Sequence, residues 1–111
     1  MQISAIGVRT GMPQGLDSKM QAYYRAKQQG DQHLMASDLD WTVIEPGELT
    51  EDAGTGRIKA AADLGGFGSI ARADVAAVVV AALQQPGTIR KALEVLSGDL
   101  PISEALQKAT A

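Results

Sequence analysis

The most constraining feature of this 111-residue chain is a predicted helix that leads directly into a predicted buried strand, between Ala22 and Leu49. Four positions at spacings of three and four share one face of that helix, namely Tyr23, Lys27, Gly30 and Leu34. An ammonium one turn from a phenol eases release of the phenol's proton and can also hydrogen-bond a ribose. The pair therefore has the chemistry of a proton donor, although an amphipathic helix with a packed Tyr23 and a solvated Lys27 is the commoner explanation of such a pair on its own.

The strand half of this stretch indicates an α/β sheet. Residues 41–44, Trp-Thr-Val-Ile, are aromatic or β-branched and stop at Pro46-Gly47. Such a short run with little polar alternation is typical of a parallel strand that is buried on both faces. Because open α/β sheets bind ligands at the carboxyl ends of their strands, we expect a site beside Pro46 and Gly47.

The rest of the chain continues the alternation of strands and helices. Beyond a helix over about 19–37, the pattern predicts strands at Gln2–Val8, 57–61 and 92–96, and helices at 72–84 and from Pro101 onward. Apolar strands alternating with helices imply one domain, residues 1–111, with a three-layer α/β fold and a mostly parallel sheet. Asp74 lies in the first turn of a helix, where a carboxylate is usually structural.

Composition excludes several classes of function. The net charge is −3 and the ten Lys and Arg are scattered, so the chain lacks the basic footprint of a nucleic-acid-binding protein. It has no cysteine and a single histidine, His33, which argues against a disulfide framework and a metal site. The longest apolar run, residues 75–83, is too short to span a bilayer, and we expect a cytoplasmic protein.

Several motifs together resemble one family. They are Tyr23-x-x-x-Lys27, Asp31 with Leu34, SDLDWTVIEPGEL at 37–49, Gly56, SIARADVA at 69–76 and LEVLSG at 93–98. This set resembles the atypical short-chain dehydrogenase/reductase group of NAD(P)H-binding proteins, which is related to NmrA-like and flavin-reductase-like proteins. The resemblance covers only the second half of the family's fold, and thus implies a partial Rossmann-type fold.

The resemblance implies roles for individual residues. Tyr23 would be the proton donor, Lys27 would hold the cofactor ribose, and Pro46 with Gly47 would line the nicotinamide side. Ser4 stands near the family's active-site Ser or Thr, although a locally bonded strand residue explains it equally. Leu49, Phe67 and Ile70 are candidates for an apolar pocket wall, in a region that could also be an ordinary mobile loop.

The chain contains no glycine-rich phosphate loop, because neither G-x-G-x-x-G between a strand and a helix nor G-K-[ST] occurs. The resemblance implies NADP or NAD as cofactor, but we expect the isolated chain to bind neither. It would then be the catalytic and substrate half of an NAD(P)H-dependent oxidoreductase, inactive alone. The alternatives are a non-catalytic binding or regulatory module and a self-associating relic. Glu45 stands where the family usually has Arg, and an acidic residue beside the cofactor would favour these alternatives.

The chain opens inside the predicted strand Gln2–Val8, as expected of a truncated or internally started domain. In the family fold a strand that these residues do not supply pairs with this one. An unpaired edge beside uncovered apolar surface recruits another chain. We therefore expect a homodimer, or a separate nucleotide-binding partner chain.

Overall fold

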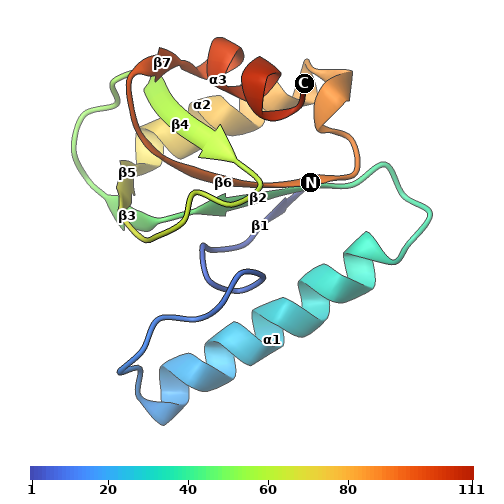
Figure 1. Cartoon of the computed structure of the whole chain (residues 1–111), viewed down its shortest axis with the longest axis vertical. Helices are drawn as coiled ribbons and strands as arrows, with labels where there is room; N and C mark the ends of the chain where they lie inside the picture. The colour runs from blue at the N-terminus through green and yellow to red at the C-terminus, as the bar shows by residue number, and fades with distance from the viewer.

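A mixed five-stranded sheet forms the centre of the molecule in the computed structural model, which describes residues 1–111 (Figure 1). In spatial order its strands are β1 (Gln2–Ile3), β2 (Thr42–Pro46), β6 (Lys91–Ser97), β4 (Arg57–Ala61) and β7 (Leu100–Pro101). The first three strands are parallel, as expected, whereas β4 runs antiparallel to both β6 and β7. The predicted alternation of strands and helices is thus confirmed.

A second, two-stranded sheet continues from the carboxyl end of β2. Its strands, β3 (Glu48–Thr50) and β5 (Ser69–Ala71), are parallel. Only one residue, Gly47, separates β2 from β3, and β5 leads directly into a helix. The small sheet therefore joins the end of β2 to the start of that helix.

The helices lie on the two faces of the large sheet. Helix α1 (Ser18–Met35) lies on one side, and α2 (Arg72–Leu83) with α3 (Ile102–Ala109) lies on the other (Figure 1). A short 3₁₀ turn, η1 (Pro86–Thr88), connects α2 to β6. The three layers agree with the predicted fold class. None of the helices combines the length and apolar character needed to cross a membrane.

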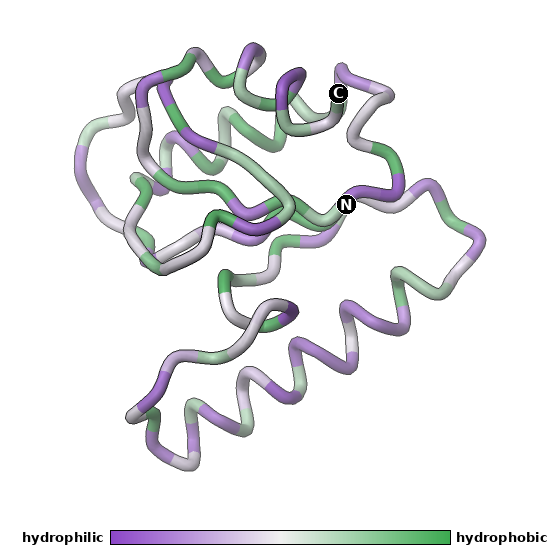
Figure 2. Tube along the Cα trace, in the orientation of Figure 1, coloured by the Kyte–Doolittle hydropathy of each residue, from purple (hydrophilic) through white to green (hydrophobic).

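The hydrophobic core lies between the sheet and the pair α2 and α3. Its largest fully buried members come from six different elements and are Ile44, Ile58, Ile70, Val78, Leu93, Val95 and Leu106. Figure 2 shows hydrophobic stretches in these strands and helices, whereas α1 is mostly hydrophilic. Asp31 is the single buried residue of α1. The two faces of the sheet are thus covered very unequally.

Acidic side chains fix two helix starts. Asp17 has a short acceptor side chain just before the predicted helix, which predicts an N-cap, and it does cap α1 by accepting a hydrogen bond from the Met20 backbone N–H at 2.8 Å. Asp74 in the first turn of α2 is 2% exposed and accepts from the backbone N–H groups of Thr55 and Gly56. The structural role predicted for Asp74 is therefore confirmed.

Two local expectations are wrong. Regular strand pairing covers only Gln2–Ile3 instead of Gln2–Val8, because the chain turns after Ala5. Ile3 is 38% exposed and so is not buried on both faces. A glycine inside a helix costs about 1 kcal/mol against alanine, so Gly30 predicts a close approach of the helix to the sheet or to a ligand. The approach to the sheet is wrong, because no protein atom lies within 4 Å of where the Gly30 Cβ would be. Gly30 therefore has open space beside it.

Candidate functional site

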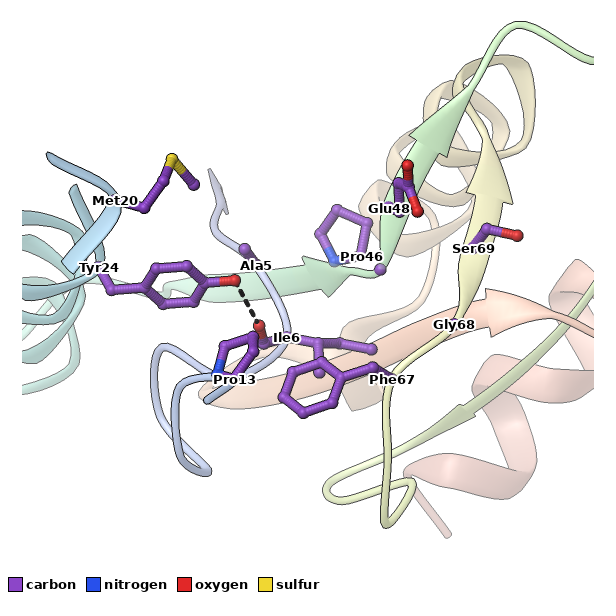
Figure 3. A pocket seen from close by; sticks show the side chains of 11 residues that line it. Ala5, Ile6, Pro13, Met20, Tyr24, Pro46, Glu48, Phe67, Gly68 and Ser69 are labelled. Carbon is purple, nitrogen blue, oxygen red and sulfur yellow. Dashed lines mark hydrogen bonds between the residues drawn. The ribbon is translucent and has the colours of Figure 1, made fainter. Parts of the chain in front are cut away.

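A groove separates the start of α1 from the carboxyl end of β2. It consists of two adjoining pockets of about 750 and about 680 Å³. The two share five lining residues, namely Ala5, Met20, Pro46, Gly47 and Glu48. Figure 3 shows α1 on one side and the turn from β2 to β3 on the other. The site thus lies at the predicted end of the predicted strand.

Close contact between backbones shapes the β2 side of the groove. A Cβ on Gly47 would lie 2.4 Å from the Gly68 carbonyl oxygen and 2.4 Å from Leu96 Cδ2. The Gly47 N–H donates to the Val95 carbonyl at 3.2 Å, and the Glu48 N–H donates to Gly68 at 2.8 Å. Only glycine fits here, and it allows Pro46 to lie at the floor of both pockets.

The pocket of about 680 Å³ brings together six of the predicted site residues. Ser4, Tyr23, Lys27, Pro46, Gly47 and Leu49 all line it. Tyr23 is 46% exposed and its hydroxyl has no hydrogen-bond partner in the protein, so the hydroxyl is available to a ligand. Lys27 Nζ donates to the Ile3 carbonyl at 2.9 Å, which holds the ammonium at the pocket wall.

The hydroxyl of Ser4 is already engaged. It donates to the carboxylate of Asp31, which is 2% exposed, and Gln2 Nε2 donates to the same carboxylate at 3.4 Å. This bond ties the first strand to α1, which agrees with the structural alternative for Ser4. It also gives Asp31 its polar partners inside the protein.

The pocket of about 750 Å³ is lined by aromatic rings. Phe67 lines it as expected, together with Tyr24, which the sequence reasoning did not single out. The Tyr24 hydroxyl donates to the Ile6 carbonyl at 3.4 Å (Figure 3). The Tyr24 ring meets that of Tyr23 edge to face, with 5.9 Å between the ring centres. Burial raises the pKa of Tyr24 above its ordinary value of 10.0.

Ile70 is not a pocket-wall residue, which corrects the expectation. It is 0% exposed and belongs to the hydrophobic core under α2. The alternation of side chains along β5 explains this, because neighbouring Ser69 faces the groove and Ile70 must then face the opposite way. Sequence alone did not indicate which of the two would point inward.

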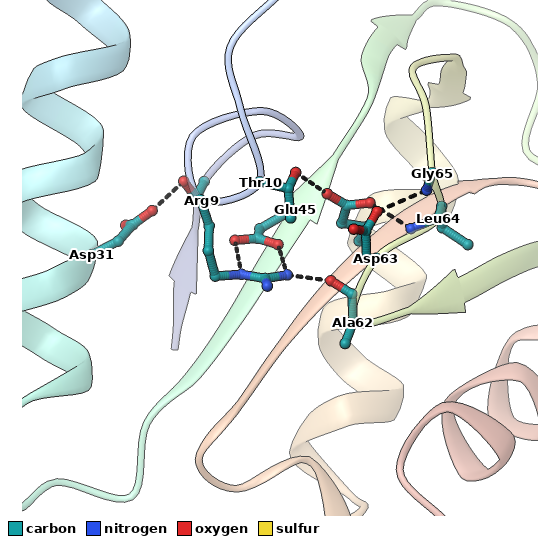
Figure 4. Close-up of polar contacts among 10 residues, drawn as sticks. Arg9, Thr10, Asp31, Glu45, Ala62, Asp63, Leu64 and Gly65 are labelled. Atoms are coloured by element: carbon teal, nitrogen blue, oxygen red, sulfur yellow. Dashed lines mark hydrogen bonds and ion pairs between the residues drawn. The ribbon is translucent and has the colours of Figure 1, made fainter.

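Glu45 does not present its charge to the groove. It is 1% exposed, and the Arg9 guanidinium donates two hydrogen bonds to its carboxylate, from Nη2 at 2.8 Å and from Nε at 3.1 Å (Figure 4). This hydrogen bonding raises the pKa of Arg9. The pKa of Glu45 is raised, chiefly by burial, although Arg9 acts to lower it. The reversed charge is therefore neutralised internally, and the argument that it opposes a dinucleotide is wrong.

A second buried carboxylate stands beside the first. Glu94 on β6 pairs in register with Glu45 and accepts hydrogen bonds from Thr10 Oγ1 and from the Leu64 backbone N–H, each at 2.7 Å (Figure 4). Arg9 also donates to the Ala62 carbonyl. The two carboxylates thus fasten the loop after the first strand and the loop after β4 onto the open face of the sheet.

Sequence reasoning missed four residues of the groove and its supports, namely Arg9, Lys19, Tyr24 and Arg72. Lys19 and Arg72 line the same pocket as Tyr23. Arg72 lies in the SIARADVA motif at 69–76, and its place in that motif could have marked it as a site residue. The contact between Arg9 and Glu45 joins residues 36 positions apart, and no local pattern could have revealed it.

No cluster of three or more His, Asp or Glu side chains is arranged to hold a metal ion.

Comparison with known proteins places these features in a family. A model of the family described as NAD(P)H-binding matches residues 1–86. The uncharacterised sugar epimerase YhfK of Bacillus subtilis is 45% identical over 89 residues, which are 80% of this chain and 41% of YhfK.

Two solved structures share the fold. A proposed NAD-dependent epimerase/dehydratase from Bacillus halodurans superposes with a TM-score of 0.86 at 34% identity, and the oxidoreductase ylbE from Lactococcus lactis with 0.83 at 29%. Each match covers 96% of this chain and 49% of the other. The chain thus spans about half the length of these relatives. A family match over residues 1–86, together with a fold shared along nearly the whole chain, shows that this protein belongs to the NAD(P)H-binding family.

Proposed function

We propose that this chain is the catalytic and substrate-binding half of an NAD(P)H-dependent oxidoreductase. One observation carries the proposal: Tyr23, Lys27 and the Pro46-Gly47 turn line a single pocket, and the Tyr23 hydroxyl is unbonded there. A phenol that faces open space beside an ammonium can deliver a proton to a carbonyl or imine as hydride arrives. The relatives described as an oxidoreductase and an epimerase/dehydratase support this class of chemistry.

Each residue has a separate role in that reaction. Tyr23 donates the proton, and Lys27, held by the Ile3 carbonyl, keeps a positive charge one helical turn away. Pro46 and Gly47 supply a flat wall for the nicotinamide ring, and Leu49 with Phe67 adds apolar surface for the substrate. When bound, NADPH or NADH would supply the hydride. Its pyrophosphate has no glycine-rich loop among residues 1–111, and so must be held by another segment or chain.

The test is a chimera in which this chain replaces the matching segment of YhfK. NADPH and NADH binding is measured by nicotinamide fluorescence, and turnover by loss of NADPH absorbance with phenanthrenequinone or flavin mononucleotide as acceptor. We expect Lys27→Gln to weaken cofactor binding and Tyr23→Phe to remove turnover. Tyr24→Phe is the matched control, because Tyr24 lies on the same helix with its hydroxyl engaged by Ile6. Equal turnover in the Tyr23→Phe chimera would refute the proposal.

The second candidate is a regulatory module that binds a nucleotide without chemistry. The bond from Lys27 Nζ to the Ile3 carbonyl favours it, because it satisfies one donor of the ammonium without any ligand. The engaged hydroxyl of Ser4 favours it too. A chimera that binds NADPH but does not oxidise it, whichever acceptor is added, would support this candidate over the first.

A further inference from the structure

The groove is basic although the chain as a whole is acidic. The net charge of the protein is −3. In contrast, the pocket of about 680 Å³ is lined by three cations, Lys19, Lys27 and Arg72, and one carboxylate, Glu48. Local positive charge of this kind concentrates anions near a site even when the protein's overall charge is negative.

Two of these cations have donors free for a ligand. Lys19 forms no ion pair, and Arg72 uses Nε on Glu51 at 2.5 Å while its two Nη groups have no partner in the protein. The Arg72–Glu51 pair is exposed, so it exchanges readily with solvent and other anions. Lys27, in contrast, is held at the pocket wall by the Ile3 carbonyl.

The positive character comes from these side chains and not from the helix ends. Helices α1 and α2 both begin at the groove, but Asp17 caps the first and Asp74 lies in the first turn of the second. Each carboxylate offsets the partial positive charge of its helix start. A ligand anion would therefore have to reach Lys19 and Arg72 themselves.

The same pocket also has apolar surface beside the cations and Tyr23. Ile3, Ala5, Met20 and Leu49 line it, and Met20 is 41% exposed. We infer that the groove binds a substrate with an apolar body and an oxyanion at one end, with the oxyanion at Lys19 and Arg72 and the reducible end at Tyr23. This inference deepens the proposed function and rests on it for the reducible end.

The test uses the 111-residue chain and three probes with six carbon atoms each: hexanoate, hexyl phosphate and hexanol. Amide chemical shifts are followed by nuclear magnetic resonance as each probe is added. We expect at least one of the two anions to bind about fivefold more tightly than hexanol, since an exposed charge pair contributes up to about that factor. The double variant Lys19→Gln/Arg72→Gln should lose the preference, and added salt should weaken it in the wild type.

Arg25→Gln is the matched control, because Arg25 is a cation on α1 whose Nη2 binds Gln21 and which does not line the groove. Preference for hexanoate over hexyl phosphate would identify a carboxylate, and the reverse a phosphate monoester. Equal affinity for all three probes, or a preference that survives in the double variant, would overturn the inference. Tyr23→Phe should leave anion preference intact, so a failed reductase assay and a failed anion assay are distinguishable.

Discussion

Replacing Gly47 by Ala should destabilise the protein through a steric clash. The added Cβ would lie 2.4 Å from both the Gly68 carbonyl oxygen and Leu96 Cδ2. A methyl group needs about one ångström more to reach ordinary van der Waals contact, and Gly68 contributes backbone that cannot rotate away. The turn from β2 to β3 must then move off β5, which opens the floor of the groove.

The magnitude follows from the clash and the bonds beside it. Forcing a methyl group into a packed site costs about 1–3 kcal/mol. The hydrogen bonds from Gly47 to Val95 and from Glu48 to Gly68 are at risk, and each contributes about 1 kcal/mol. We expect the free energy of unfolding to fall by about 2–4 kcal/mol. The protein should still fold at low temperature if its stability lies in the usual range of about 5–15 kcal/mol.

Urea denaturation followed by circular dichroism measures this change. Gly66→Ala and Gly30→Ala are the controls, because neither glycine has an atom within 4 Å of an added Cβ. We expect Gly66→Ala to be nearly neutral and Gly30→Ala to stabilise α1 by up to about 1 kcal/mol. If Gly47→Ala were as stable as wild type while both controls behaved as expected, the steric argument would be wrong.

Four further predictions concern the cofactor, the site, pH and assembly. The isolated chain should bind NADPH more weakly than micromolar by calorimetry, because residues 1–111 contain no phosphate loop, and a micromolar dissociation constant would contradict this. In the YhfK chimera Tyr23→Phe should lower kcat about a hundredfold or more with little change in cofactor affinity, as steady-state kinetics would measure, because it removes only the proton donor. Burial raises the pKa of Glu45, so the folded protein keeps that proton to higher pH than the unfolded chain does. The contribution of Glu45 to the free energy of unfolding therefore falls as pH rises. The difference in urea stability between wild type and Glu45→Gln should show that fall from pH 4.5 upward, and a pH-independent difference would refute it. Finally, the open edge of β1 and the exposed face of α1 should make the chain a homodimer by light scattering, and a single monomer mass would exclude this.

Local patterns predicted most of the fold. The apolar run at 41–44 and the Pro46-Gly47 stop correctly placed β2, because a fully buried strand has little choice of sequence. The cap at Asp17 follows from its short acceptor side chain just before the helix, and the structural role of Asp74 follows from its place in the first turn of α2. The bonds from the Thr55 and Gly56 N–H groups to Asp74 are long-range and were not predicted. The first strand was overestimated because an apolar run does not reveal where the chain turns.

The site was less predictable because its parts come from distant segments. Helical spacing placed Tyr23 and Lys27 on one face, but it could not show that Lys27 would bind the Ile3 carbonyl. The charge of Glu45 was misread because its partner, Arg9, comes from a turn with no regular pattern. Long-range pairs of this kind depend on how the chain folds back over the sheet, and one sequence does not record that.

The unequal covering of the sheet has a consequence for motion. Apart from bonds to the residues just before α1, every side-chain hydrogen bond that joins this helix to the rest of the domain involves residues 2–6. Strand β1, which includes the first of these residues, is itself paired on one edge only. With so little apolar burial, α1 and β1 should open together at a lower free energy than the core, and their amides should exchange with deuterium first. Tyr23 and Lys27 lie on that opening unit, whereas Pro46 and Gly47 lie on the rigid one. Whatever binds across the groove therefore joins the two units, and it should slow amide exchange along the whole of α1.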